Sequence, residues 1–155
     1  MKLKVLAIGT RAPSWVSAGF NEYAARMPPH MAIELVEVSA PAHRGWTAER
    51  LREEEGGRLL GRVGDGDRIV ALDGGGKTLS TEKLAARMDD WRMLGGDVIF
   101  MIGGADGLHS RVLAAAQETL SLSALTFPHM LVRVILAEQL YRAWTLLEGH
   151  PYHRG

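Results

Sequence analysis

The sequence predicts an α/β fold, in which helices cover both faces of a parallel β-sheet. Short apolar segments typical of buried strands alternate along the chain with longer segments typical of helices, and this alternation indicates consecutive βαβ units. The chain has 155 residues, a length that suits one domain, and no repeat, low-complexity stretch or linker divides it. We therefore expect residues 1–155 to form a single domain.

The first half of the chain supplies three strands and two helices. The strands are expected at 2–9, 31–38 and 68–73. In the second of them apolar residues alternate with acidic ones, which is typical of a strand near the edge of a sheet. A helix over 14–27 carries its apolar residues on one stripe and has Ser14 as its expected cap. The next helix, over 47–63, is highly charged and should be weakened at Gly56 and Gly57.

The second half continues the alternation. Helices are expected at 80–94, 110–119 and 129–147, and strands at 97–103 and 121–125. The last helix is apolar around nearly its whole circumference, so it must be covered on two sides. In so small a domain a two-fold partner is the expected second cover, which predicts a homodimer.

Composition excludes several classes of protein. No apolar run approaches the length of a membrane helix, and the N-terminus lacks the features of a signal peptide. Cysteine is absent, which excludes disulfides and thiolate metal sites and fits a cytoplasmic protein. The formal net charge is zero, so a contact with nucleic acid would depend on a local basic patch.

Three turns follow the carboxyl ends of consecutive expected strands. They are "DGGGKT" (73–78), "GGADG" (103–107) and "SALTFPH" (123–129). In a parallel sheet all three leave at the same edge, where α/β folds bind ligands. Glycine lets the backbone approach a ligand closely, although each glycine turn taken alone is more often a tight connection between a strand and a helix. Together the turns predict a pocket that recognises a flat, polar molecule mainly through main-chain groups.

The turn "GGGKT" raises the alternative of a phosphate-binding loop. That loop requires Gly-x-x-x-x-Gly-Lys-Ser/Thr, but the position five before Gly76 is Ala71, inside the expected strand. The dinucleotide pattern Gly-x-Gly-x-x-Gly also fails, because Ala105 occupies its second glycine position. Nucleotide binding of either kind is therefore weakly supported.

Longer motifs resemble a known family. "LKVLAIGTRAPSWV", "GGADG", "LSLSALTFPHMLVRVILAEQLYRAW" and the terminal "HPYHR" are similar to the RlmH family of SPOUT-class methyltransferases, over essentially the whole chain. The resemblance implies S-adenosylmethionine-dependent methylation of N3 of a pseudouridine in 23S ribosomal RNA. A net charge of zero indicates weak binding to naked RNA, so we expect the substrate to be the assembled ribosome. The resemblance also implies a cytoplasmic homodimer and a SPOUT-type sheet with a deep C-terminal trefoil knot.

The resemblance further implies that the three turns hold S-adenosylmethionine. The matching positions here are 72–76, 103–107 and 122–128. The cofactor-binding candidates among them are Leu72, Asp73, Gly74, Gly103, Gly104, Gly107, Leu122, Ser123, Ala124, Leu125, Thr126, Phe127 and Pro128. No metal is expected. His150 and His153 alone, without cysteine or a cluster of carboxylates, are poor evidence for a metal site.

Candidates for catalysis follow from the chemistry of the acceptor. N3 of a uracil-like ring carries a proton at neutral pH, and histidine is the side chain best matched to removing it, which points to His129 and His153. Arginine can stabilise the negative charge that develops on the ring, and tyrosine can stack on a base. The candidates for these two roles are Arg133, Arg142, Arg154 and Tyr152. We expect the cofactor turns of one subunit to meet the tail of the other.

Plainer roles remain open for some of these residues. Arg142 lies four residues after Glu138, the favourable order for a helix ion pair. Arg133 is surrounded by apolar residues and would need a structural partner if buried. His129 is also placed to cap the last helix.

Three other functions also remain open. The first is methylation of a different RNA position, such as a transfer-RNA base. The second is a phosphate-binding protein or nucleotide kinase that uses "GGGKT". The third is a non-catalytic ribosome-assembly factor that binds RNA through its basic tail.

Overall fold

The sheet has five strands, all parallel, in the order β2-β1-β4-β3-β5. The computed structural model describes residues 1–154, so Gly155, the last residue of the expected domain, lies outside them. The strands are β1 (Leu3–Ile8), β2 (Ile33–Val38), β3 (Arg68–Thr78), β4 (Val98–Ile102) and β5 (Glu118–Ser121). The predicted α/β fold with a parallel sheet is confirmed, and β2 lies at an edge as expected. The trefoil knot stays a prediction.

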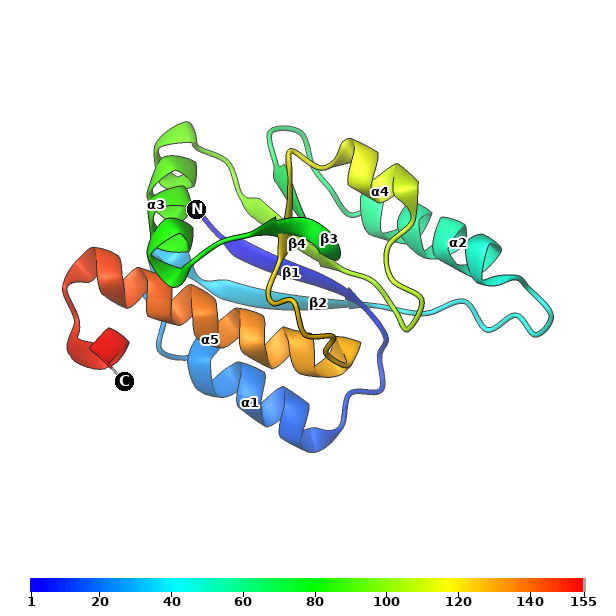
Figure 1. Ribbon diagram of the computed structural model, residues 1–155, viewed down its shortest axis with the longest axis horizontal. Helices are drawn as coiled ribbons and strands as arrows, with labels where there is room; N and C mark the ends of the chain where they lie inside the picture. Colours follow the sequence, from blue (N-terminus) through cyan, green and yellow to red (C-terminus); the bar gives the residue numbers. More distant parts are fainter. Residues whose placement is uncertain (155) are drawn as a thin grey trace.

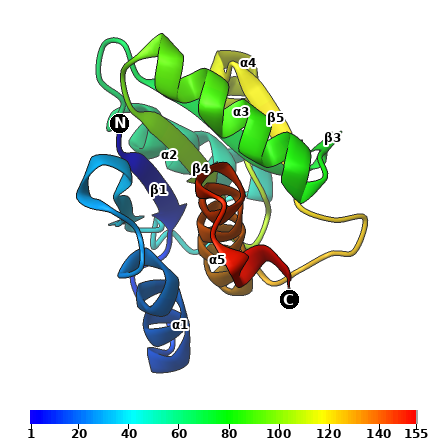
Figure 2. The ribbon, with the colours of Figure 1, turned by 90° about the vertical axis from the view of Figure 1, so that its left-hand side faces the viewer.

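Helices cover both faces of the sheet (Figures 1 and 2). They are α1 (Ser14–Ala24), α2 (Ala48–Leu60), α3 (Thr81–Leu94), α4 (Ser110–Ala115) and α5 (His129–Glu148), with 3-10 turns η1 (Pro29–Met31) and η2 (Pro151–Arg154). Helices α1, α3 and α5 lie on one face, and α2 and α4 lie on the other. The expected alternation of strands and helices therefore builds a three-layer arrangement.

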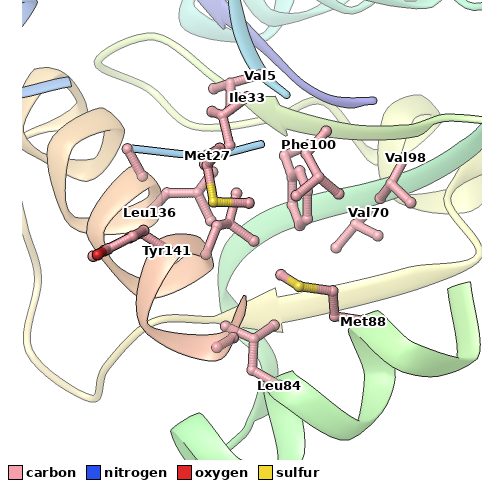
Figure 3. Close-up of a cluster of buried hydrophobic side chains, with 14 of the residues drawn as sticks. Val5, Met27, Ile33, Val70, Leu84, Met88, Val98, Phe100, Leu136 and Tyr141 are labelled. Carbon is pink, nitrogen blue, oxygen red and sulfur yellow. The ribbon is translucent and has the colours of Figure 1, made fainter. Parts of the chain in front are cut away.

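The larger hydrophobic core lies between the sheet and the layer of α1, α3 and α5 (Figure 3). Phe100 of β4 is fully buried there, and its ring meets the edge of Trp91 with 5.7 Å between ring centroids. Leu136 of α5 and Met88 of α3 reach the same cluster from two helices. A smaller core under α2 and α4 contains Leu59 and residues of the opposite sheet face. Burial of these side chains is the main contribution that holds the layers together.

Side-chain caps begin α2 and α3. The hydroxyl of Thr47 accepts a hydrogen bond from the Arg50 N–H (3.1 Å), and Ser80 accepts one from the Lys83 N–H (3.2 Å). The predicted cap at Ser14 is wrong, because Pro13 occupies the cap position and no side chain bonds there. Proline fixes the extended-to-helical transition one residue earlier than the serine would.

Two boundaries predicted between residues 110 and 125 are wrong. Helix α4 ends at Ala115, four residues before the expected end, and β5 spans 118–121, not 121–125. Gln117 explains the change, because its N–H donates to the Ile69 carbonyl (3.0 Å) and its side chain accepts from the Ile69 N–H (2.6 Å). These two bonds begin the pairing with β3 early and leave residues 122–128 outside the sheet.

Strand β3 continues through the glycine turn that was expected to end it. Its pairing with β5 shifts register between Leu72 and Lys77, so residues 73–76 bulge out of the ladder before Lys77 pairs with Leu120. A Cβ atom on Gly76 would lie 2.8 Å from backbone atoms of Thr119 and Leu120. Glycine at this position therefore lets β3 and β5 approach each other.

Replacing Gly76 by alanine tests this contact. We expect Gly76→Ala to lower the free energy of unfolding by about 1–3 kcal/mol, because the methyl group would force two backbones apart. Gly74→Ala is the matched control, since a Cβ at Gly74 meets no atom within 4 Å. Chemical denaturation measures both variants, and equal stability of the two would contradict the role assigned to Gly76.

Candidate functional site

A cavity of about 520 Å³ lies at the carboxyl ends of β4, β3 and β5. These three strands are neighbours in the sheet, so the turns after β4 and β5 converge with residues 72–74 of β3. The predicted convergence is confirmed, although the expected turn 73–78 is part of β3 and does not follow it. All the cofactor-binding candidates line this cavity: Leu72, Asp73, Gly74, Gly103, Gly104, Gly107 and residues 122–128. Gly75, Gly76 and Asp106, which belong to the matched ranges, do not line it. The geometry is therefore confirmed, while the binding role of each residue stays a prediction.

The turn 103–107 is a compact wall made largely of main chain. The Gly107 N–H donates to the Gly104 carbonyl (3.1 Å), and Gly107 has a φ of 81°, in the left-handed region that favours glycine. A Cβ atom on Gly103 would lie 2.6 Å from the backbone of Gly107. This packing keeps the wall thin and brings backbone groups to the cavity surface.

The turn 122–128 forms the opposite wall. The Ser121 hydroxyl donates to the Ser123 carbonyl (2.9 Å), and the Ser123 hydroxyl accepts from the Leu125 N–H (3.0 Å). These local bonds shape the turn from within its own residues and Ser121. Leu125 stands at the rim with 73% of its surface exposed.

The cavity carries one acidic side chain among the described residues that line it, Asp73. One carboxylate oxygen of Asp73 accepts a hydrogen bond from the Gly75 N–H (2.9 Å), which fixes the side chain at the start of the bulge. Lys77, which a phosphate-binding loop would direct at its ligand, is not one of the lining residues. The site is therefore better suited to a molecule with a positive group than to a polyphosphate.

His129 lines the cavity at the first residue of α5. Its Nδ1 atom is buried and has no hydrogen-bond partner among the described residues. Burial lowers the pKa of His129, and the nearby positive charge of Arg133 lowers that pKa further. The neutral imidazole is thus favoured, and it can accept a proton. The alternative role as a helix cap is wrong, because Pro128 takes the cap position and no side chain bonds there.

Arg133 has a structural partner. Its side chain is fully buried and pairs with Glu37 of β2 (Nη1 to Oε2, 2.8 Å). Its other terminal nitrogen donates to the carbonyls of Ile8 (3.2 Å) and Gly9 (2.8 Å). The alternative of a structural ion pair is confirmed, and it ties the start of α5 to the carboxyl ends of β1 and β2.

The remaining catalytic candidates lie toward the other end of α5. Arg142 pairs with Glu138 at 2.7 Å, as its spacing predicted. The Tyr152 hydroxyl donates to the same Glu138 carboxylate (3.2 Å), and the Tyr152 ring lies 4.9 Å from the Arg142 guanidinium carbon. Burial, with the charge of Glu138, raises the pKa of Tyr152 to about 12, so its hydroxyl stays a donor. His153 is half-buried, and Arg154 is exposed.

One chain does not bring the two groups of candidates together. Helix α5 spans residues 129 to 148, and at 1.5 Å per residue it is about 30 Å long. His129 is at its first residue, while η2, with Tyr152, His153 and Arg154, packs at its far end (Figure 1). A site that used both groups would need a second copy of the chain.

Sequence reasoning left out three residues that line the cavity: Ile102, Leu120 and Val132. Ile102 and Leu120 lie at strand ends and look like ordinary core residues.

Sequence reasoning also did not connect Glu55 of α2 with the turn 103–107. The Glu55 carboxylate lies against Gly104, since a Cβ atom added to Gly104 would be 3.0 Å from one of its oxygens. Burial, and then the charge of Asp106, raises the pKa of Glu55. No local pattern connects this helix residue with the turn.

Neither a metal centre nor a membrane span is found in residues 1–154. Within this range no three or more of His, Asp and Glu gather closely enough to hold a metal ion. None of the helices described there is both long and apolar enough to cross a bilayer.

Comparisons with known proteins point to one group of enzymes. The sequence model of the family described as "Predicted SPOUT methyltransferase" matches residues 1–153. The chain is 53% identical to "Ribosomal RNA large subunit methyltransferase H" of Chromohalobacter salexigens, over 99% of this chain and 100% of that protein. It is 50% identical to the protein of the same name from Azotobacter vinelandii, again over 99% and 100%.

A solved structure shares the fold. It is described as a probable methylase family protein from Haemophilus influenzae, with a TM-score of 0.59. The likeness covers 97% of this chain and 69% of that one at 12% sequence identity, so it speaks for the fold alone.

The titration of His129 tests the electrostatics of the cavity. We expect its ring resonances in NMR spectra to titrate below the ordinary value near 6.5 of a histidine peptide. The stability that the neutral ring contributes is then fully present above pH 6.5 and is lost as the pH falls below it. His129→Gln should remove this part of the acid sensitivity. A His129 pKa at or above 6.5 would contradict the lowering of this pKa by burial and by the charge of Arg133.

Proposed function

The chain belongs to the SPOUT methyltransferase family, and we propose that it transfers a methyl group from S-adenosylmethionine to N3 of a pseudouridine in 23S ribosomal RNA. The observation that carries the proposal is the convergence of three main-chain turns on one cavity. The names of its near-full-length relatives support ribosomal RNA as the substrate. The assembled ribosome is the proposed substrate, which places the enzyme in the cytoplasm.

The cavity fits the methyl donor in size and chemistry. Pockets for ligands of this kind measure about 300–1,000 Å³, and this one measures about 520 Å³. The turns 103–107 and 122–128 supply backbone groups for the polar adenosyl portion, and Asp73 supplies one negative charge near a cationic ligand. When bound, S-adenosylmethionine supplies an electrophilic methyl group on a positively charged sulfur.

His129 is the proposed acceptor of the N3 proton. It lies on the cavity wall, and its lowered pKa keeps the ring neutral and able to take that proton at neutral pH. Removal of the proton turns N3 into a nucleophile. Most of the remaining rate enhancement then comes from holding donor and acceptor in line.

The tail residues complete the site from a second subunit. Arg142, Tyr152, His153 and Arg154 lie at the wrong end of α5 to reach the cavity of their own chain, which supports a homodimer with shared sites. Trp15 at the start of α1, 58% exposed, and the half-buried Leu131 at the start of α5 supply apolar surface for a partner. In this arrangement the partner's arginines stabilise charge on the base, and its tyrosine stacks on the RNA.

Damage to the cavity wall tests the proposal. Gly103→Ala should weaken binding of S-adenosylmethionine by about tenfold or more and abolish the methyl mark on 23S ribosomal RNA, since its methyl group displaces the turn 103–107. Calorimetry measures the binding, and mass spectrometry of ribosomal RNA from a complemented deletion strain measures the mark.

Gly57→Ala is the control for this variant. It adds the same methyl group on α2, where the nearest atom is at an ordinary 3.7 Å, so binding and mark should be retained. Binding of magnesium ATP in place of S-adenosylmethionine by the wild type would favour a kinase. Binding of neither ligand would favour an assembly factor. Either result overturns the proposed function.

Mixed dimers test the shared site. One subunit lacks residues 151–155, and the other carries Gly103→Ala. If sites are shared, the purified heterodimer should have about half the activity of the wild-type dimer, because one site combines intact turns with an intact tail. If each subunit has its own complete site, the heterodimer should be inactive.

A further inference from the structure

A three-layer stack of side chains stands on the loop between β2 and α2, residues 39–47, here called the β2–α2 loop. The His43 ring lies flat on Trp46, with centroids 4.0 Å apart and planes 3° from parallel. The Arg50 guanidinium carbon lies 4.2 Å from the Trp46 ring centroid. Since the imidazole covers one face of the indole, the guanidinium must cover the other. Gly45, with a φ of 84°, reverses the chain between the two rings.

The outer layer of this stack faces solvent. His43 is exposed, and the inner face of its ring is the one that meets Trp46, so the other flat face is available. The stack holds this face in a fixed orientation before any ligand arrives, which reduces the entropy lost on binding. A flat, preorganised π-surface of this kind suits an unpaired nucleic-acid base.

The arginines around the stack differ from their neighbours on α2. Arg52 pairs with Glu49, and Arg58 pairs with Glu54. Arg44 and Arg50, both exposed, make no ion pair with a carboxylate in the described part of the chain. Two guanidinium groups without a carboxylate partner therefore lie by the stack: Arg44 is next to His43 in the chain, and Arg50 forms the layer at the opposite end from the exposed His43 face.

The β2–α2 loop adjoins the candidate site. It follows the carboxyl end of β2, so it leaves the sheet at the same edge as the cavity turns (Figure 1). Helix α2, which follows the loop, contacts residues in and next to the turn 103–107. Glu49 contacts the His109 ring (2.9 Å), and Arg52 donates to the Asp106 carbonyl (3.3 Å). RNA that places a nucleotide in the cavity has further chain within reach of this loop.

We propose that the β2–α2 loop is a second RNA-binding site, at which an unpaired base near the target nucleotide stacks on the outer face of His43, Arg44 contacts an adjacent phosphate, and Arg50 supports the stack from behind Trp46. This proposal rests on the proposed function, because it assigns a further contact to the same RNA. A protein partner would be expected to bury apolar surface, whereas this site presents one flat ring beside an arginine that has no carboxylate partner.

Substitutions at His43 separate stacking from other roles. His43→Ala and His43→Leu should raise the KM for ribosomes about tenfold, with kcat and the affinity for S-adenosylmethionine unchanged, because both remove the flat surface. His43→Phe keeps a flat ring and should stay within about twofold of the wild type. His30→Ala is the control. His30 is exposed and precedes β2, at the amino ends of the strands, so this variant should change neither KM nor kcat.

Three outcomes would overturn the site. An unchanged KM in His43→Ala would show that the ring makes no contact. Equal loss in His43→Phe and His43→Ala would show that a flat ring is not what matters. A changed affinity for S-adenosylmethionine in the His43 variants would assign the loop to the cofactor cavity.

Because the chain contains no cysteine, one introduced cysteine can be labelled alone and used to map the RNA that lies near the β2–α2 loop. A single cysteine at exposed Ala42 (Ala42→Cys), carrying an iron chelate that cleaves nearby RNA, should cut 23S ribosomal RNA close to the methylated nucleotide. Cleavage confined to ribosomal proteins, or to RNA remote from that nucleotide, would contradict the proposal. These outcomes can be told apart from failure of the proposed function. If the proposed function were wrong, the unmodified protein would transfer no methyl group to this nucleotide.

Discussion

The parallel pairing of three neighbouring strands, β4, β3 and β5, is the constraint on which the candidate site depends. Because these strands run in one direction, the turns after β4 and β5 leave at the same end of the sheet as the bulge of β3, and together they enclose one cavity. The close approach of β3 to β5 is possible only because Gly76 has no side chain to place against Thr119 and Leu120. The glycine run therefore serves two purposes: Gly76 joins two strands, and Gly74 stands at the cavity. Its resemblance to a phosphate-binding loop is a consequence of this dense packing of glycines.

Helix α5 links the cavity to the rest of the molecule. At its start, the buried pair of Arg133 and Glu37 fixes the helix against β1 and β2, and this places His129 on the cavity wall. Such a pair contributes more to a unique position than to stability, because burying both charges offsets much of their attraction. At its far end, Glu138 accepts from both Arg142 and Tyr152, which docks the tail on the helix. One helix thus carries two sets of proposed functional groups that cannot meet within a chain. This separation is the physical reason for proposing a dimer with shared sites.

The sequence predicted the parallel sheet and the convergence of the turns well, because both follow from local patterns and a general rule for α/β folds. It failed where distant residues decide. The boundary of β5 depends on two bonds between Gln117 and Ile69, which are 48 positions apart. The cap of α1 shifted because Pro13 precedes the serine that was expected to serve. The stack of His43, Trp46 and Arg50 escaped notice, because it requires the chain reversal at Gly45 to bring the rings together. The knot has no local signal at all and was expected only from family resemblance.

The central claim is that the three turns act together as the binding site for one methyl donor. Hydrogen–deuterium exchange measured with and without S-adenosylmethionine tests it most directly, since it reports on every turn at once. The account predicts slower exchange of amides in 103–107 and 122–128 and around Leu72, with little change in α2 or at the amino edge of the sheet. Slower exchange confined to a single turn, or located away from this edge, would contradict it.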